Sequence, residues 1–402
     1  MMVWKPKCVK EKSKFKISLC DSIELIHEEH WNQTNSIDNI YLSIPYLKAI
    51  ESTLLDELSF RYLQFYDEEN KPLGMAIVQI VSIRDNVENH DAIFCSVAEN
   101  IRKKLLKTID AKVLVCGNLF SCGENGYAFE KSISSEDTMQ MLNNGLKRIR
   151  ESENINDNQI SYYLLKEFWP ESFPQSDALR KHDFKDFMID VNMVLPIHKE
   201  WKSFDDYLAS MTTKFRTKAK SAFKKSVELK HRQLSATEIE DNSARIQELF
   251  DNVVDQSEFS LGELKANTFI ELKRAIGDKL KFTGYYLNER LVGFCCATIL
   301  SNGSVEANYV GLDYEVNRSN ALYQRMLYNM VAFAIEKGLG KIHFGRTAEE
   351  LKSTLGAVPM DMKLYIRHRN KLSNQLLKPI ISSINPSEFE LRNPFKANFT
   401  FG

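Results

Sequence analysis

Apolar residues in the second half of the chain follow two periods, and each period predicts a different kind of element. Where they recur every three or four positions, as at Ile246, Leu249, Phe250 and Val253, the pattern is that of a helix with one buried face. Short apolar runs bounded by Asn and Gly predict strands instead. The expected helices are 203–208, 243–254, 268–276, 320–337 and 348–355, and the expected strands are 281–287, 291–300, 305–312, 341–345 and 360–367.

The ends of these elements carry residues that are typical of helix boundaries. Ser203 followed three residues later by Asp206 resembles a capping box at a helix start. Gly338 and Gly356 follow two of the helices, where a left-handed residue commonly ends the helix. The resulting order of helices and strands predicts a mixed α/β domain around a central sheet.

The first half of the chain repeats this order more faintly. It predicts strands and one long helix, and Gly74 in the first hairpin occupies the place of Gly293 in the second. We therefore expect an internal duplication with two tandem domains, residues 1–195 and 196–402. The expected elements of the first half are the strands 59–66, 73–83, 112–117 and 161–167 and the helix 136–150.

Length and composition agree with two folded domains. The chain has 402 residues, of which 43% are hydrophobic and 27% charged, so each half can bury a core of its own. The formal net charge of -1 gives no global reason to expect a nucleic-acid or membrane-surface protein, and DNA is not an expected partner. No apolar run is long enough to span a membrane and the N-terminus lacks an export signal, so we expect a cytoplasmic protein that contacts the inner membrane at most peripherally.

Two stretches of the second half resemble the FemAB-like, GNAT-type acyltransferases of bacteria. They are residues 201–220, WKSFDDYLASMTTKFRTKAK, and residues 344–357, FGRTAEELKSTLGA. The resemblance covers about residues 187–370 and is only architectural before them. It implies two tandem GNAT-like domains and the transfer of an acyl or aminoacyl group to an amine, with a degenerate first domain and the active site in the second. The implied co-substrate is acyl-CoA or acyl carrier protein, with charged tRNA as the alternative.

One stretch departs from the pattern of acetyl-CoA-dependent GNAT enzymes. Those enzymes have a Gln/Arg-x-x-Gly-x-Gly/Ala loop after the central strand, whereas here residues 314–322 read YEVNRSNAL and contain no glycine. The chain thus lacks the residues that would let its backbone approach a CoA pyrophosphate closely.

The residues that would carry chemistry lie on and after the expected central strand. Glu306 could act as the base that frees the amine, and Asn308 shares its face by the two-residue period of a strand. Tyr309 could act as an acid or orient the substrate, and Tyr323 could protonate a leaving thiolate. The competing interpretations are a carboxylate at a strand edge for Glu306 and packed aromatic rings for the two tyrosines.

Positive side chains would bind the phosphate-bearing part of the donor. Arg346 and Lys352 match motif positions of the family and follow a strand of the sheet, where α/β proteins place ligands. Arg318 precedes the long helix and could pair with a phosphate, and Arg216 and Lys218 belong to a basic helical segment that could bind tRNA, CoA or an anionic lipid. Exposed surface charges are the ordinary alternative. The histidines show no ligand spacing, so no metal site is expected.

The sequence supports one main hypothesis and two rivals. The first is an N-acyltransferase that moves an acyl group from a thioester to an amine of a cell-envelope precursor or a lipid, in a ternary complex without a covalent enzyme intermediate. The second is an aminoacyl-tRNA-dependent peptidyltransferase of peptidoglycan synthesis. The third is a non-catalytic binding module that kept the scaffold and lost its cofactor loop.

Overall fold

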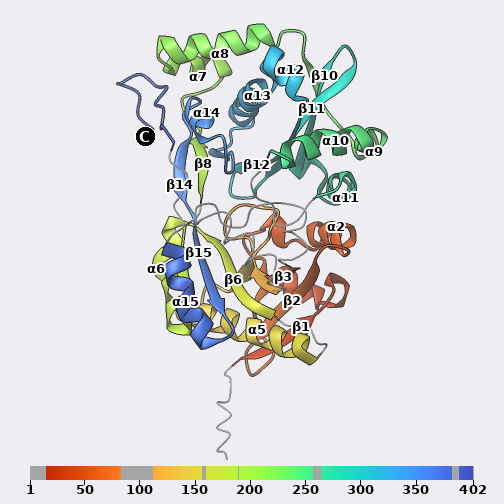
Figure 1. Ribbon diagram of the computed structural model, residues 1–402, viewed down its shortest axis with the longest axis vertical. Coiled ribbons are helices and arrows are strands. Elements are labelled where there is room, and N and C mark those ends of the chain that lie inside the picture. Colours follow the sequence, from red (N-terminus) through yellow and green to blue (C-terminus); the bar gives the residue numbers. More distant parts are fainter. Residues whose placement is uncertain are drawn as a thin grey trace, which may run out of the picture.

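The chain forms two mixed sheets, one for each half of the molecule (Figure 1). The structure is a computed structural model, and it describes residues 15–82, 112–155, 160–188, 190–256, 264–382 and 389–401. Within these residues, no helix is long and apolar enough to cross a membrane.

The first sheet has the strand order β1-β2-β3-β4-β6-β15-β7, with β5 beside β3. Its only parallel pair among the described strands is β4 with β6, and the other neighbours are antiparallel. The strands are β1 (Lys16–Cys20), β2 (Ser59–Tyr66), β3 (Pro72–Ser82), β4 (Lys112–Cys116), β5 (Tyr127–Phe129), β6 (Ile160–Phe168), β7 (Lys185–Phe187) and β15 (Lys363–His368).

The second sheet has the order β14-β8-β13-β12-β11-β10-β9, and its parallel pair is β12 with β13. The strands are β8 (Val191–Pro196), β9 (Lys230–Gln233), β10 (Leu280–Leu287), β11 (Arg290–Ile299), β12 (Ser304–Leu312), β13 (Lys341–His343) and β14 (Val358–Asp361). The α-helices are α1 (Glu28–Thr34), α2 (Ile44–Leu54), α5 (Ser135–Ile155), α6 (Phe173–Ser176), α7 (Phe204–Ser210), α8 (Thr213–Lys225), α9 (Ala236–Asp241), α10 (Ser243–Val254), α11 (Ala266–Ile276), α12 (Tyr314–Asn320), α13 (Leu322–Glu336), α14 (Glu349–Ser353) and α15 (Lys371–Ser382).

Three apolar cores lie between the sheets and helices of the molecule, and the middle core contains residues of both halves. In the middle core, Leu47 and Ile50 of α2 are buried together with Phe269 of α11 and Phe294 of β11. One outer core lies between the first sheet and α5, and the other lies between the second sheet and the helices α7, α8 and α13. Because burial of apolar surface is the main stabilising contribution to folding, the shared core joins the halves into one packed body.

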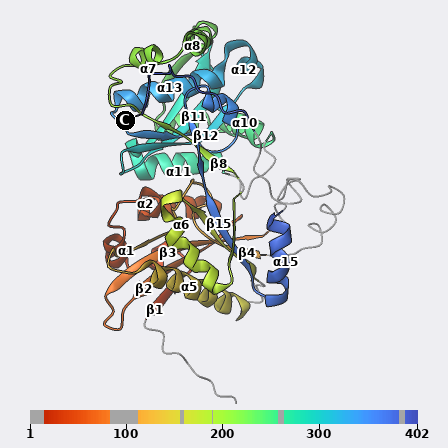
Figure 2. The same ribbon diagram turned by 90° about the vertical axis from the view of Figure 1, so that its left-hand side faces the viewer.

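The two halves also exchange strands. β7 and β8 are nearly consecutive in the chain but lie in different sheets, and the same is true of β14 and β15. β15 lies between β6 and β7, where Tyr365 is opposite both Leu165 and Asp186. Figure 2 shows β15 and α15, in blue, among the elements of the first half. The chain therefore passes from the first sheet to the second between Phe187 and Val191.

Most expected elements of the second half are present at their predicted positions. The capping box of Ser203 and Asp206 is formed, and α10 spans the predicted residues 243–254. The helix expected at 320–337 begins at Leu322, because Ala321 adopts a left-handed conformation and separates it from the additional helix α12. The division into domains 1–195 and 196–402 stays a prediction. The strand pairing shows that this boundary falls inside β8 and that residues 363–368, from the second half of the chain, complete the first sheet.

Candidate active site

A bulge in β12 turns the predicted catalytic residues toward the first half. In the pairing with β11, Ala307 lies opposite Ala297 and Tyr309 lies opposite Cys296, so Asn308 is the extra residue. A bulge of this kind changes the alternation of side chains. Glu306 and Tyr309, which strict alternation would place on opposite faces, therefore both contact the first half.

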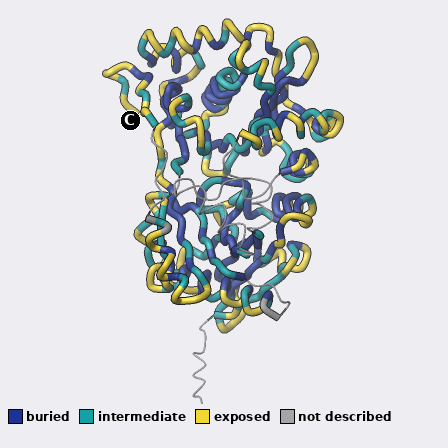
Figure 3. The backbone as a smooth tube through the Cα atoms, in the orientation of Figure 1, coloured by how far each residue is buried: buried dark blue, intermediate teal, exposed yellow. Residues whose placement is uncertain are grey.

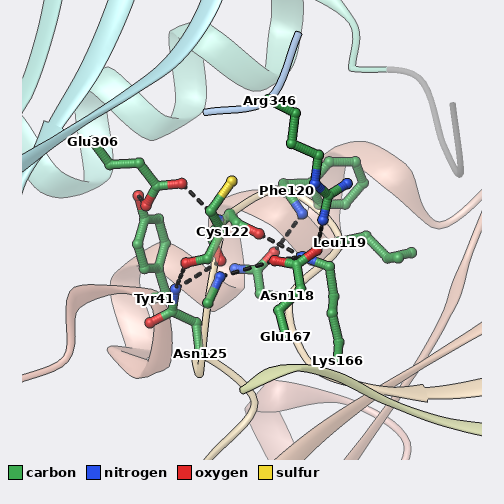
Figure 4. A network of polar contacts seen from close by, with 12 residues as sticks. Tyr41, Asn118, Leu119, Phe120, Cys122, Asn125, Lys166, Glu167, Glu306 and Arg346 are labelled. Atoms are coloured by element: carbon green, nitrogen blue, oxygen red, sulfur yellow. Dashed lines mark hydrogen bonds and ion pairs between the residues drawn. The ribbon is translucent and has the colours of Figure 1, made fainter. Parts of the chain in front are cut away.

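Glu306 bridges the two halves through both of its carboxylate oxygens. Its Oε2 accepts a hydrogen bond of 2.6 Å from the Tyr41 hydroxyl, and its Oε1 accepts one of 2.6 Å from the Cys122 amide. Asn308 donates to the same Tyr41 hydroxyl at 3.0 Å, which confirms that Asn308 and Glu306 share a face. Glu306 is therefore a bridging carboxylate and not the strand-edge carboxylate of the competing interpretation (Figure 4).

The environment of Glu306 suits a group that exchanges protons. The side chain is 3% exposed, and burial raises the pKa of its carboxyl above the ordinary value. The hydrogen bonds from Tyr41 and Cys122 and the charge of Lys166 act in the opposite direction. Perturbed carboxyls are common where an enzyme needs a base close to neutral pH, although structural networks also perturb them.

The partner of β12 across the interface is the loop 117–126, which follows β4. The Tyr309 hydroxyl donates to the Phe120 carbonyl at 2.6 Å. Gly117 and Gly126 approach so closely that a Cβ on Gly126 would lie 2.6 Å from the Gly117 Cα, so a side chain there would force the loop open. This close contact keeps the loop folded back on itself, with the Cys122 amide directed at Glu306.

A second set of charges crosses the interface beside Glu306. Glu167 is fully buried at the end of β6 with a φ of 60° and forms an ion pair with Arg346. Its Oε2 accepts hydrogen bonds of 2.9 Å from the Lys166 ammonium and from the Gly123 amide. In Figure 4 the Cys122 sulfur lies between Glu306 and Arg346. Arg346 thus binds an acidic group of the protein itself, and 32% of its side chain stays exposed.

The contacts of Glu306 and the ion pair of Glu167 with Arg346 lie where the parallel strands of each sheet separate. The β12–β13 pairing ends at Glu306 and His343, and the β4–β6 pairing ends at Cys116 and Leu165. Ligands of α/β proteins commonly bind where neighbouring strands diverge at the edge of a sheet. The separation points of the two sheets are connected by the contacts of Glu306 and of Arg346, so this interface is our candidate active site.

Lys352 supports the turn that carries Arg346. The Lys352 side chain is buried, and its ammonium donates to the carbonyl of Gly345 at 3.2 Å and to that of Arg346. Burial lowers the pKa of Lys352 to about 8. α14 begins after Ala348 without a side-chain cap, and both Thr347 and Ala348 have positive φ. Lys352 therefore positions Arg346 through the backbone.

Lys166 makes the stability of the interface depend on pH. Burial, assisted by the Arg346 guanidinium, lowers the pKa of Lys166 to about 7, whereas an unfolded lysine keeps its proton up to about pH 10. Between these values the unfolded chain binds more protons than the folded chain, so stability rises with pH. We expect the free energy of unfolding, measured in urea, to increase from pH 7 to pH 9, and Lys166→Met to remove roughly 1 kcal/mol of this increase per pH unit.

The matched control is Lys131→Met, which changes an exposed lysine. This variant should keep the slope of the unmodified protein. Lys352, with its pKa of about 8, contributes in the same direction and leaves a residual slope in Lys166→Met. An identical slope in Lys166→Met and the unmodified protein would show that Lys166 keeps its proton in the folded state.

The region that corresponds to the cofactor loop of GNAT enzymes is a helix here. α12 replaces a glycine-rich turn, and the Asn317 side chain accepts a hydrogen bond of 2.9 Å from the Tyr323 amide at the start of α13. A helix N-terminus offers such amides to a phosphate, but this amide already has an acceptor. Tyr323 itself packs against the outer core of the second half, and burial raises the pKa of its hydroxyl. Arg318 is exposed on α12.

The remaining predicted residues lie elsewhere. Arg216 and Lys218 belong to α8, which packs against α13 at the end of the molecule farthest from the first half (Figure 1). The structure thus brings Glu306, Asn308, Tyr309 and Arg346 to one interface and leaves Arg216 and Lys218 outside it. Within the described ranges, no group of His, Cys, Asp and Glu could hold a metal ion.

Sequence analysis missed the first-half residues of the interface. Tyr41, Cys122, Lys166 and Glu167 contact the second half or the residues that do, yet the first half was expected to be degenerate. A signal was present in the loop 117–126, where three glycines occur within ten residues after a buried strand. Such a concentration indicates close approach of backbone segments.

Comparisons with known proteins identify the fold. A scan against models of protein families finds no match, and a search of curated proteins finds no similar sequence. Among solved structures, a tandem GNAT protein from the clavulanic acid biosynthesis pathway is similar with a TM-score of 0.51 and 8% identity, over 88% of this chain and 99% of that one. This chain therefore has the tandem GNAT fold that the resemblance of its second half implied.

Two further structures are similar over most of their length. The C-terminal domain of a putative lysylphosphatidylglycerol synthetase from Agrobacterium fabrum has a TM-score of 0.49 and 7% identity, over 88% of this chain and 96% of that one. A conserved protein of unknown function from Bacteroides thetaiotaomicron has a TM-score of 0.49 and 10% identity, over 87% and 99%. At these identities the similarity concerns the fold, and the activity has to be argued from the site.

Proposed function

We propose that the protein is an N-acyltransferase that transfers an acyl group from a thioester to an amine, with Glu306 as the base. The observation that carries this proposal is the buried Glu306 carboxyl, with its raised pKa, at the point where β12 and β13 separate. The amine nitrogen attacks the thioester carbonyl, its proton passes to Glu306, the C–S bond breaks and the thiolate leaves with that proton. Direct attack needs no covalent enzyme intermediate.

Tyr41 and the loop 117–126 would position this base. The Tyr41 hydroxyl and the Cys122 amide hold both carboxylate oxygens, so the orientation of Glu306 is determined before a substrate arrives. Preorganised groups lower the barrier because little rearrangement is needed during the reaction. An amine would reach Glu306 by taking the place of one of these two donors. The first half would then take part in the reaction, and the acceptor would be an amine of a cell-envelope precursor or of a lipid.

A non-catalytic binding module is the second candidate. α12 in place of the glycine loop favours it, as does the capping of the Tyr323 amide by Asn317. Under this alternative, Glu306 and Arg346 join the halves and carry no chemistry. The two functions differ in whether the protein binds an activated donor.

A thermal-shift screen of the full chain separates these functions. A ligand that binds only the folded state stabilises it by about 2.7 kcal/mol at a concentration of 100 times its dissociation constant. We expect stabilisation by a long-chain acyl-CoA or an acylated carrier protein, and a smaller effect of free CoA. Stabilisation by charged tRNA alone would replace the proposal by aminoacyl transfer, and the absence of any response would favour the binding module.

A further inference from the structure

The outward face of α8 carries a dense set of cations that the proposed reaction does not use. The helix turns Phe215, Ala219, Ala222 and Phe223 toward the outer core of the second half. By the 3.6-residue period, the remaining positions point outward. They hold three hydroxyl residues, Thr213, Thr217 and Ser221, and six cations: Lys214, Arg216, Lys218, Lys220, Lys224 and Lys225.

These cations have no ion-pair partners in the part of the chain that the structure describes. All except the half-buried Arg216 are exposed. The acidic residues nearest in sequence are Asp205 and Asp206 before the helix and Glu228 after it, and Asp206 is hydrogen-bonded in the cap of α7. The concentration is notable because the whole chain has a net charge of -1.

The position of α8 suits a broad surface as a partner. α8 runs across the end of the second half, and its outward face is exposed while its inward face is buried (Figures 1 and 3). The face is the convex outside of a single helix. Clusters of four to eight basic residues on an amphipathic helix are typical of proteins that bind anionic lipids.

We propose that the outward face of α8 docks the protein on an anionic membrane surface. Five of the six cations are lysines, which attract diffuse negative charge, whereas arginine is preferred for bidentate recognition of individual phosphates. The single arginine, Arg216, is the least exposed of the six. Val227, two residues beyond the helix, is 76% exposed and supplies an apolar contact for the interface of the bilayer.

RNA fits this face less well. Single-stranded RNA is usually held by exposed aromatic rings on which bases stack. The two aromatic residues of α8, Phe215 and Phe223, pack against the core, and Arg325 covers the Phe223 ring. The electrostatic attraction of a phosphate backbone remains, so RNA binding is tested beside lipid binding.

The test is co-sedimentation of the full chain with vesicles of phosphatidylcholine, with and without about one third phosphatidylglycerol. We expect binding only to the anionic vesicles, and a decrease when the NaCl concentration rises, because salt screens the attraction. The variant Lys220→Gln/Lys224→Gln/Lys225→Gln should lower the apparent affinity about 100-fold, since each lysine near such a surface contributes about 1 kcal/mol.

The matched control is Lys131→Gln/Lys279→Gln/Lys337→Gln, which removes the same charge from exposed lysines outside α8. Full binding by this control, with loss in the α8 variant, supports the proposal. Equal losses in both variants would attribute binding to net charge and overturn it. Binding of duplex RNA that the α8 variant loses, without binding to anionic vesicles, would also overturn it and assign the face to RNA.

Discussion

Ile366→Pro in β15 is expected to unfold the first half of the molecule, although this residue lies near the end of the chain. Ile366 pairs with Leu164 of β6 on one side and with Lys185 of β7 on the other. Proline removes the backbone N–H and is excluded from the middle of a sheet. We expect the free energy of unfolding, measured by urea denaturation, to fall by about 1–3 kcal/mol or more, because a buried backbone acceptor loses its donor. We also expect a loss of amide protection in residues 160–168 by hydrogen-exchange mass spectrometry.

Met360→Pro is the matched control for this substitution. Met360 lies in β14 at the edge of the second sheet, where it pairs with Asn192 of β8 alone. The control should lower the free energy of unfolding by less, because edge strands tolerate proline. Its loss of amide protection should be confined to the second sheet. Intact protection of β6 in Ile366→Pro would show that the exchanged strand is dispensable for the first sheet.

Glu306→Gln is expected to lower turnover by a factor of about 10² to 10⁴, the usual contribution of a general base. Glutamine keeps the shape of the side chain and one acceptor oxygen, so the contacts with Tyr41 and Cys122 survive in part. Leaving one buried donor without an acceptor costs about 1–3 kcal/mol of stability. The measurement is the rate of acyl transfer from the donor identified in the screen, at several pH values.

Two comparisons separate catalysis from stability. Glu315→Gln makes the same change at an exposed position of α12 and should leave both rate and stability unchanged. Asn308→Ala removes a hydrogen bond to Tyr41 without touching the carboxyl, so it should cost stability with a smaller loss of rate. Unchanged turnover in Glu306→Gln, together with a lower melting temperature, would reduce Glu306 to a link between the halves.

Local pattern predicted the elements well and their pairing across the chain poorly. Helix α10 and the hairpin of β10 and β11 follow from periodicity and from a polar turn at Asn288 and Glu289, both of which have positive φ. The assignment of β15 to the first sheet could not be predicted this way, because a run such as 360–367 fits any sheet with an open position. The pairing of β15 with β6 and β7, and the burial of Tyr365 in the outer core of the first half, decide it.

The candidate site was predicted from one side only. Glu306 and Asn308 follow from the two-residue period, whereas the orientation of Tyr309 depends on a bulge that the sequence does not mark. Arg346 was expected to meet a ligand, and the structure shows it paired with Glu167 of the first half. Contacts between residues more than 100 positions apart arise from tertiary packing, so a single sequence carries little information about them.

The exchanged strand also determines when the first sheet can be completed during synthesis. The ribosome produces β7 long before β15, and at roughly 5–20 residues per second the intervening residues 188–362 take roughly 9–35 s. During this time β6 has an unpaired edge and β7 has no neighbour among the described strands. Unpaired edges recruit strands from other chains. The nascent first half therefore exposes a strand edge that a chaperone could cover until β15 is synthesised, and slower translation would lengthen this exposure.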